Sequence, residues 1–191
     1  MPAARKRLVC VVEGHGETAA VPLLCHKVLE ILEAWTWFVD PDPIRQPRAS
    51  LVKAGRPNDA GMTRAVRLAR ARPADAVLVV CDADDDCPVA WGPAGELIVT
   101  RVLTGACVMA SREYESWLLA ARLDTSKLGA RRIEEIRGAK ERFKVEWPGY
   151  KPHVDQLAAT REIDVVRLRS LAPSFDKLVR SLEKIVGVPA R

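Results

Sequence analysis

The chain has 191 residues, of which 48% are hydrophobic and 29% are charged, and its formal net charge is +5. This composition supports one folded domain with a sizeable core and excludes a largely disordered chain. The five cysteines include no CxxC pair, which argues against a disulfide framework or a zinc ribbon. We expect no membrane span and no signal peptide, because the basic start leads into a short apolar run that ends at Glu13. We therefore expect a cytoplasmic protein.

Apolar runs alternate with helix-like segments along the chain. Strands are expected at 7–12, 76–81 and 106–110, and helices at about 18–33, 59–72, 93–103, 151–158 and 174–186, with another starting at Ser111. Prolines break the segment 35–59, which predicts only a short irregular strand near Ile44. Residues 131–144 predict a charged helix or loop.

The expected strands do not alternate in polarity, and helices separate them. This pattern predicts an α/β fold with a central parallel sheet covered by helices on both faces. We expect a single domain over residues 1–191, in which 125–191 form a mostly helical C-terminal extension.

Acidic residues follow each of the three expected strands. They are Glu13 after the first strand, Asp82 and Asp84 after the second, and Glu113 and Glu115 after the third. In open α/β sheets ligands bind outside the carboxyl ends of the strands, so we expect these carboxylates to meet at one edge. In extended chain Asp82 and Asp84 face the same way, about 6.5 to 7 Å apart, where they repel unless a cation lies between them.

Oxygen ligands of this kind favour Mg²⁺ or Mn²⁺ over zinc. A solvated acidic loop remains the alternative interpretation of the DADDD segment. In any regular backbone geometry, Asp85 and Asp86 do not both point toward the same side as Asp82 and Asp84. Helix capping or solvent exposure would explain them, and Asp86 is a further candidate site residue. His15, in the turn beside Glu13, is either a substrate contact or a solvent-facing residue.

Basic residues near this edge are candidate contacts for phosphate. They are Arg112, Lys53, Arg101 and Arg48, and a solvated surface charge is the alternative for each. Two metal ions about 3.5 to 4 Å apart would clamp a phosphodiester, so the pattern points to phosphodiester chemistry.

The segments VVEGHGET and VLVVCDADDD together resemble the Toprim domain of topoisomerases, bacterial primases and OLD-type nucleases. That domain carries a glutamate after its first strand and a D-x-D after a later one. SREYESWLLA, YKPHVDQLAAT and SFDKLVRSL are similar to segments of a small stand-alone Toprim-like family, whose members are often encoded beside ABC-type ATPases. The resemblance covers residues 7 to about 185. The family's strand between the first helix and the D-x-D strand is poorly marked here, which leaves the shape of the substrate groove open.

The resemblance implies a Rossmann-like fold and a Mg²⁺- or Mn²⁺-dependent nuclease that acts on nucleic acid, with an ABC-type ATPase partner in phage defence. It implies roles for matched residues: Glu13 as metal ligand or general acid/base, Asp82 and Asp84 as metal ligands, Glu113 and Glu115 as further ligands, and Lys151 and Asp155 as the family's lysine and aspartate. In this scheme Lys151 would stabilise charge on the scissile phosphate.

Two other functions remain open. A haloacid-dehalogenase-like phosphatase also uses D-x-D after a strand, but it expects Thr or Val after the second Asp, and Asp85 follows here. A non-catalytic subunit that holds metal or nucleic acid for an ATPase would need the same acidic residues. The sequence does not decide between DNA and RNA, or between a monomer and a homodimer.

Overall fold

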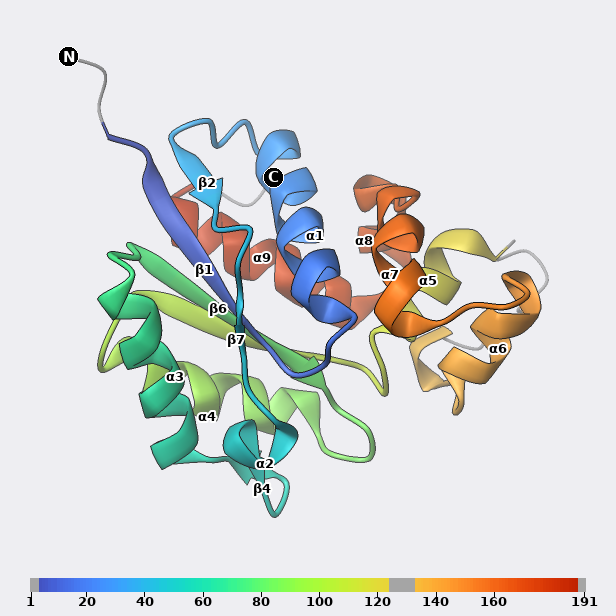
Figure 1. Ribbon diagram of the computed structural model, residues 1–191, viewed down its shortest axis with the longest axis horizontal. Coiled ribbons are helices and arrows are strands. Elements are labelled where there is room, and N and C mark those ends of the chain that lie inside the picture. The colour runs from blue at the N-terminus through green and yellow to red at the C-terminus, as the bar shows by residue number, and fades with distance from the viewer. Residues whose placement is uncertain (1–3, 124–132, 189–191) are drawn as a thin grey trace.

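The computed structural model describes residues 4–123 and 133–188, and Figure 1 shows how its elements are arranged. The strands are β1 (Lys6–Val12), β2 (Trp37–Val39), β3 (Ile44–Arg45), β4 (Val52–Lys53), β5 (Arg56–Pro57), β6 (Ala76–Asp82) and β7 (Gly105–Ala110). The helices are α1 (Glu17–Ile31), α2 (Arg48–Leu51), α3 (Asp59–Ala71), α4 (Pro88–Thr100), α5 (Glu115–Arg122), α6 (Ala139–Glu146), α7 (Pro152–Arg161), α8 (Val165–Leu171) and α9 (Pro173–Val186), with a short 3-10 helix at Ile133–Glu135.

A parallel sheet forms the centre of the fold. Its strand order is β2-β1-β6-β7, and β3 also pairs with β1, beyond the end of β2. Because β1, β6 and β7 all run in the same direction, their carboxyl ends lie at one edge of the sheet. The segments that follow these three strands therefore meet, as the sequence predicts.

The side chains of the sheet alternate between two hydrophobic cores. Leu8, Cys10 and Val12 of β1 pack on the side of α1, α5 and α9, whereas Val9 and Val11 pack on the side of α3 and α4. Strands β6 and β7 alternate in the same way. Both faces are apolar, which is why the strands read as continuous hydrophobic runs. The predicted α/β class with helices on both faces is confirmed.

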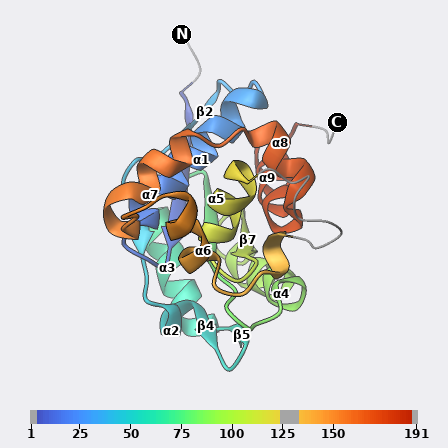
Figure 2. The same ribbon diagram turned by 90° about the vertical axis from the view of Figure 1, so that its right-hand side faces the viewer.

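The C-terminal part is helical, as expected, and it contributes to the main core. Helix α9 buries Phe175, Leu178, Val179 and Leu182 and packs against β7. Figure 2 faces the side on which α5, α6 and α7 gather, beyond the carboxyl ends of the strands. The expected start of the extension at residue 125 lies outside the described residues, as do residues 1–3 and 189–191.

Several local expectations need correction. Helix α4 begins at Pro88, whereas the sequence predicted a start at Pro93. Proline is tolerated in the first turn of a helix, so Pro88 can occupy the first helical position. Helix α5 begins at Glu115 and not at Ser111, since Arg112 has a left-handed φ of 65°. The proline-broken segment also forms β2 and the antiparallel hairpin of β4 and β5, in addition to the strand expected near Ile44.

Helix α8 was not expected from the sequence. Asp164 caps it by accepting a 3.0 Å hydrogen bond from the backbone N–H of Arg167. Within the two described segments, no helix has both the length and the apolar character that crossing a membrane requires.

Candidate active site at the carboxyl edge of the sheet

Glu17 is a buried carboxylate at the start of α1, with only 6% of its surface exposed. Its Oε2 accepts hydrogen bonds from the backbone N–H groups of Glu13, at 3.1 Å, and of Gly14, at 3.2 Å. These bonds close the turn between β1 and α1. Burial raises the pKa of Glu17 to about 7, the two hydrogen bonds oppose the rise, and the charges of Glu13 and Glu115 add to it.

Asp82 and Glu115 bring two further carboxylates to the same place. The backbone N–H of Tyr114 donates to Oδ1 of Asp82 at 2.7 Å, and the hydroxyl of Tyr150 donates to Oε1 of Glu115 at 3.2 Å. Loss of solvent raises the pKa of Asp82 well above its ordinary value, and the negative charges of Glu17 and Glu115 raise it further. Burial also raises the pKa of Glu115. The three carboxylates thus disfavour one another's ionised forms.

A hollow of about 750 Å³ opens over this group. It is lined by Gly14, His15, Gly16, Glu17, Asp82, Glu115, Lys140, Pro152, His153 and Gln156. The wall opposite the sheet comes from α6 and the start of α7. Carboxylates, imidazoles and an ammonium group therefore line one concave surface, and groups of these kinds can transfer protons or stabilise charge on a ligand.

Gly16 allows α7 to approach the turn after β1. A Cβ atom at this position would lie 1.9 Å from Oε1 of Gln156 and 2.8 Å from the backbone oxygen of Pro152. Only glycine fits such a close approach, so Gly16 determines how near α7 lies to Glu17.

Arg48 forms a second cluster beside the hollow. Its guanidinium lies 3.5 Å from Oε2 of Glu13, 3.2 Å from Oδ2 of Asp84 and 2.5 Å from Oδ2 of Asp86. It also donates to the backbone oxygen of Asp82 at 2.6 Å. Burial raises the pKa of Glu13, while the positive charge of Arg48 lowers it. Arg48 is thus the internal counter-ion of three of the predicted acidic residues.

The extended geometry assumed for Asp82 and Asp84 does not hold. Strand β6 ends at Asp82, and Asp84 has a φ of 50°, in the left-handed region. Asp84 is exposed and turns toward Arg48, whereas Asp82 lines the hollow. Asp85 is exposed and pairs with Arg112 and, at 3.1 Å, with Arg137.

The other predicted site residues lie around these two clusters. Glu113 accepts a 3.0 Å hydrogen bond from the backbone N–H of Lys140. Asp155 accepts a 2.7 Å bond from the backbone N–H of Lys151, so it caps α7 beside the exposed Lys151. His15 is exposed at the rim of the hollow.

The four predicted phosphate contacts do not gather in one place. Arg112 pairs with Asp85 and donates to the backbone oxygen of Asp84 at 3.0 Å. Lys53 is exposed on β4, and Arg101 forms an exposed ion pair with Asp59 at 2.5 Å. Arg48 is the one that contacts the acidic residues Glu13, Asp84 and Asp86 directly.

The sequence reasoning missed Glu17, Lys140, Gln156 and His153 as parts of one hollow. A signal for Glu17 existed, because it lies four residues after Glu13 at the start of a predicted helix. Lys140 and Gln156 belong to helices whose place against the sheet no local pattern predicts.

The donor set fits a hard cation, since Asp82, Glu17 and Glu115 offer oxygen atoms that repel one another. The side chains are not gathered as ligands. Across residues 4–123 and 133–188, no three Asp, Glu, His or Cys side chains are grouped closely enough to hold a metal ion. Hydrogen bonds from Tyr114, Tyr150 and the turn after β1 hold them at separate points.

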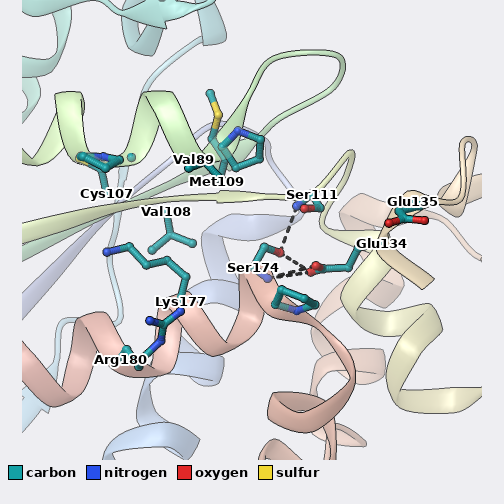
Figure 3. Close-up of a pocket in the computed structure, with 14 residues that line it drawn as sticks. Val89, Cys107, Val108, Met109, Ser111, Glu134, Glu135, Ser174, Lys177 and Arg180 are labelled. Carbon is teal, nitrogen blue, oxygen red and sulfur yellow. Dashed lines mark hydrogen bonds between the residues drawn. The ribbon is translucent and has the colours of Figure 1, made fainter. Parts of the chain in front are cut away.

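A different hollow, of about 480 Å³, lies along β7 between α4 and α9 (Figure 3). Its walls are mostly apolar, and at one end Ser174 connects Glu134 with the backbone N–H of Ser111. The indole N–H of Trp117 donates to Oγ of Ser174 at 2.8 Å. Hydrogen bonds thus link Ser174 with Glu134, Ser111 and Trp117, so this network stabilises the junction of α5 and α9 and stands apart from the carboxylate hollow.

Comparison with protein-family models, with curated proteins and with solved structures found no match for this chain. The function must therefore be argued from the residues of the hollow.

Proposed function

We propose that this protein is a nuclease of the Toprim type that hydrolyses phosphodiester bonds with Mg²⁺ or Mn²⁺. The observation that carries the proposal is the meeting of Glu17, Asp82 and Glu115 in one hollow at the carboxyl edge of a parallel sheet. The ionised forms of three poorly solvated carboxylates with raised pKa values are unfavourable, and a bound cation would stabilise them.

Asp82, Glu115 and Glu17 are the residues that would hold the cation, with Glu13 at the edge of the group. Held there, a divalent cation would activate a water and stabilise the leaving oxygen. Lys140, on the opposite wall, offers a positive charge toward the substrate phosphate. Glu113 and Lys151 keep the ligand and charge-stabilising roles that the family resemblance implies, and both lie near this wall.

The test compares cleavage of plasmid DNA and of RNA by the purified chain with Mg²⁺ or Mn²⁺. Asp82→Asn should abolish cleavage, because it removes one charge from the hollow while keeping an acceptor for the N–H of Tyr114. Asp85→Asn is the matched control, since Asp85 is exposed three residues away and pairs with Arg112. Equal cleavage by wild type and Asp82→Asn would refute the assignment.

A second candidate is a binding subunit without chemistry of its own. The separate hydrogen-bonded positions of the carboxylates, with no three of them grouped in the described part of the chain, favour it. An ABC-type ATPase partner and a role in phage defence belong to both proposals and rest on the family resemblance alone. Mn²⁺ binding without cleavage, alone and with the ATPase, would select this second function.

A further inference from the structure

The basic charge of the chain is concentrated in one segment. Residues 44–72 contain eight Lys or Arg and one Asp, a net charge of +7, whereas the whole chain carries +5. The rest of the protein is thus slightly acidic. Such an asymmetry indicates a surface for a polyanion.

Six of these cations are exposed and lie on adjacent elements. They are Arg45 on β3, Lys53 and Arg56 on the hairpin of β4 and β5, and Arg64, Arg67 and Arg70 on α3. We call this surface the basic face. Within residues 4–123 and 133–188, none of the six forms an ion pair, whereas Arg72 and Arg101 do. Their donors therefore remain available to a partner.

The placement of these charges works against the stability of the isolated fold. Lys53 and Arg56 are directly opposite each other in the hairpin, where like charges are destabilising. Arg64, Arg67 and Arg70 follow one another at three-residue spacing on the side of α3 away from the core, which is also unfavourable. A bound polyanion would remove both penalties.

The basic face adjoins the carboxylate edge. Arg48, at the start of α2, contacts Glu13 and Asp84, and α2 packs against α3. At the tip of the hairpin, a Cβ atom on Gly55 would lie 3.1 Å from Oδ1 of Asp86. In Figure 1, α2, β4 and α3 lie on the same side of the sheet, away from α7.

We propose that the basic face binds the phosphodiester backbone of nucleic acid and directs it to the carboxylate edge. This inference rests on the proposed function, because it names the surface along which the substrate of that site lies. An acidic protein is the less favoured partner. The face presents a continuous set of charges with one exposed large apolar side chain, Leu68, among the described residues, whereas the core of a protein interface is depleted in charged residues and enriched in aromatic ones.

The test measures binding of labelled DNA and RNA duplexes in EDTA, where no cleavage occurs, from about 50 to 200 mM salt. The variant Arg64→Gln, Arg67→Gln should bind about tenfold more weakly than wild type. Its plot of log K against log salt should be shallower by about 2, because each lost phosphate contact removes about 0.9 from the slope. Arg5→Gln, Arg161→Gln is the control, with the same charge change at exposed positions elsewhere. Circular dichroism confirms that each variant is folded.

Tighter binding of either duplex by wild type than by the Arg64, Arg67 variant supports the inference, and the preferred duplex identifies the source of the backbone. The inference would be overturned if the Arg64, Arg67 variant and the Arg5, Arg161 control bound with equal affinity. It would also be overturned if the wild-type protein bound neither duplex. Polyglutamate that competes as well as nucleic acid at equal charge would indicate an acidic protein partner and also overturn it. If nucleic acid binds through this face but is not cleaved in Mn²⁺, the proposed nuclease function is refuted and the basic-face proposal stands. If the Arg64, Arg67 variant cleaves as well as wild type, the basic-face proposal is refuted and the nuclease function stands.

Discussion

The backbone N–H of Tyr114 donates a 2.7 Å hydrogen bond to Oδ1 of Asp82, and this contact ties the end of β6 to the start of α5. Glu115 follows Tyr114 directly and is bonded by the hydroxyl of Tyr150. Two carboxylates from different strand ends are therefore held beside the buried Glu17. The predictions below follow from the cost of this arrangement and from the contacts that maintain it.

The carboxylate hollow should make stability fall as pH rises. A carboxyl group whose folded pKa is raised keeps its proton over a pH range in which the same group in the unfolded chain has lost it. The free energy of unfolding is therefore highest below about pH 4 and decreases as pH rises toward the folded pKa. For Glu17 the loss continues to about pH 7. A change in pKa from 4.5 to about 7 corresponds to about 3 kcal/mol. Asp82, Glu115 and Glu13 change stability in the same direction.

Glu17→Gln should therefore gain stability relative to wild type between pH 4 and about pH 7.5, by up to about 3 kcal/mol in the free energy of unfolding. The measurement is urea unfolding in EDTA at several pH values. Glu135→Gln, at an exposed glutamate, should show no such trend. A difference between Glu17→Gln and wild type that stays constant with pH would contradict the prediction.

Replacing Arg48 by Gln should leave Glu13, Asp84 and Asp86 without their shared cation. The guanidinium is partly buried, so we expect a loss of about 1 to 3 kcal/mol at neutral pH in EDTA. Millimolar Mn²⁺ should recover part of this loss by replacing the missing charge. Thermal unfolding with and without Mn²⁺ checks both effects. Arg101→Gln breaks a fully exposed pair that solvent screens and should cost far less, so equal losses in the two variants would count against this role of Arg48.

Adding one methyl group at Gly16 should displace α7 from the turn after β1. The new Cβ would overlap the side chain of Gln156 and crowd the backbone of Pro152, at an expected cost of about 1 to 3 kcal/mol. Combining Gly16→Ala with Gln156→Ala should recover part of the loss, because only the backbone contact then remains. Thermal unfolding of the single and double variants tests the prediction. A Gly16→Ala chain as stable as wild type would show that α7 does not pack this closely.

Ser174 should be important for the junction of α5 and α9. Its Oγ accepts from the indole N–H of Trp117, at 2.8 Å, and from the backbone N–H of Ser111, at 3.1 Å, and it bonds Glu134. Ser174→Ala removes the acceptor of the Ser111 N–H, whereas the indole N–H of Trp117 keeps Glu134 at 3.2 Å, so we expect a loss of about 1 to 2 kcal/mol in urea unfolding. Ser170→Ala changes an exposed serine on α8 and should cost far less. Similar losses would exclude a special role for the Ser174 network.

Local pattern predicted the framework of this protein. The apolar runs at 7–12, 76–81 and 106–110 became β1, β6 and β7, because strands buried on both faces need apolar side chains at every position. The same pattern predicted the parallel sheet and the edge at which the acidic segments meet. The helix predicted at 59–72 became α3, where Asn58 caps the start by accepting a 3.3 Å hydrogen bond from the backbone N–H of Gly61.

Local sequence pattern could not predict which acidic residues line the hollow and which pair with Arg48. Asp84 leaves the extended conformation and pairs with Arg48, a residue 36 positions earlier, so its direction depends on a contact between distant segments. Glu17 has the sequence context of an ordinary helix-start glutamate, and only the fold shows that its carboxylate is buried and lines the hollow.

By itself, then, the sequence determined the class of fold and the edge on which the acidic segments lie, because strand burial and chain direction follow from short-range patterns. Only the tertiary structure decided which carboxylates share the hollow and which are neutralised by Arg48. Solvent exclusion and ion pairing arise from segments far apart in the chain.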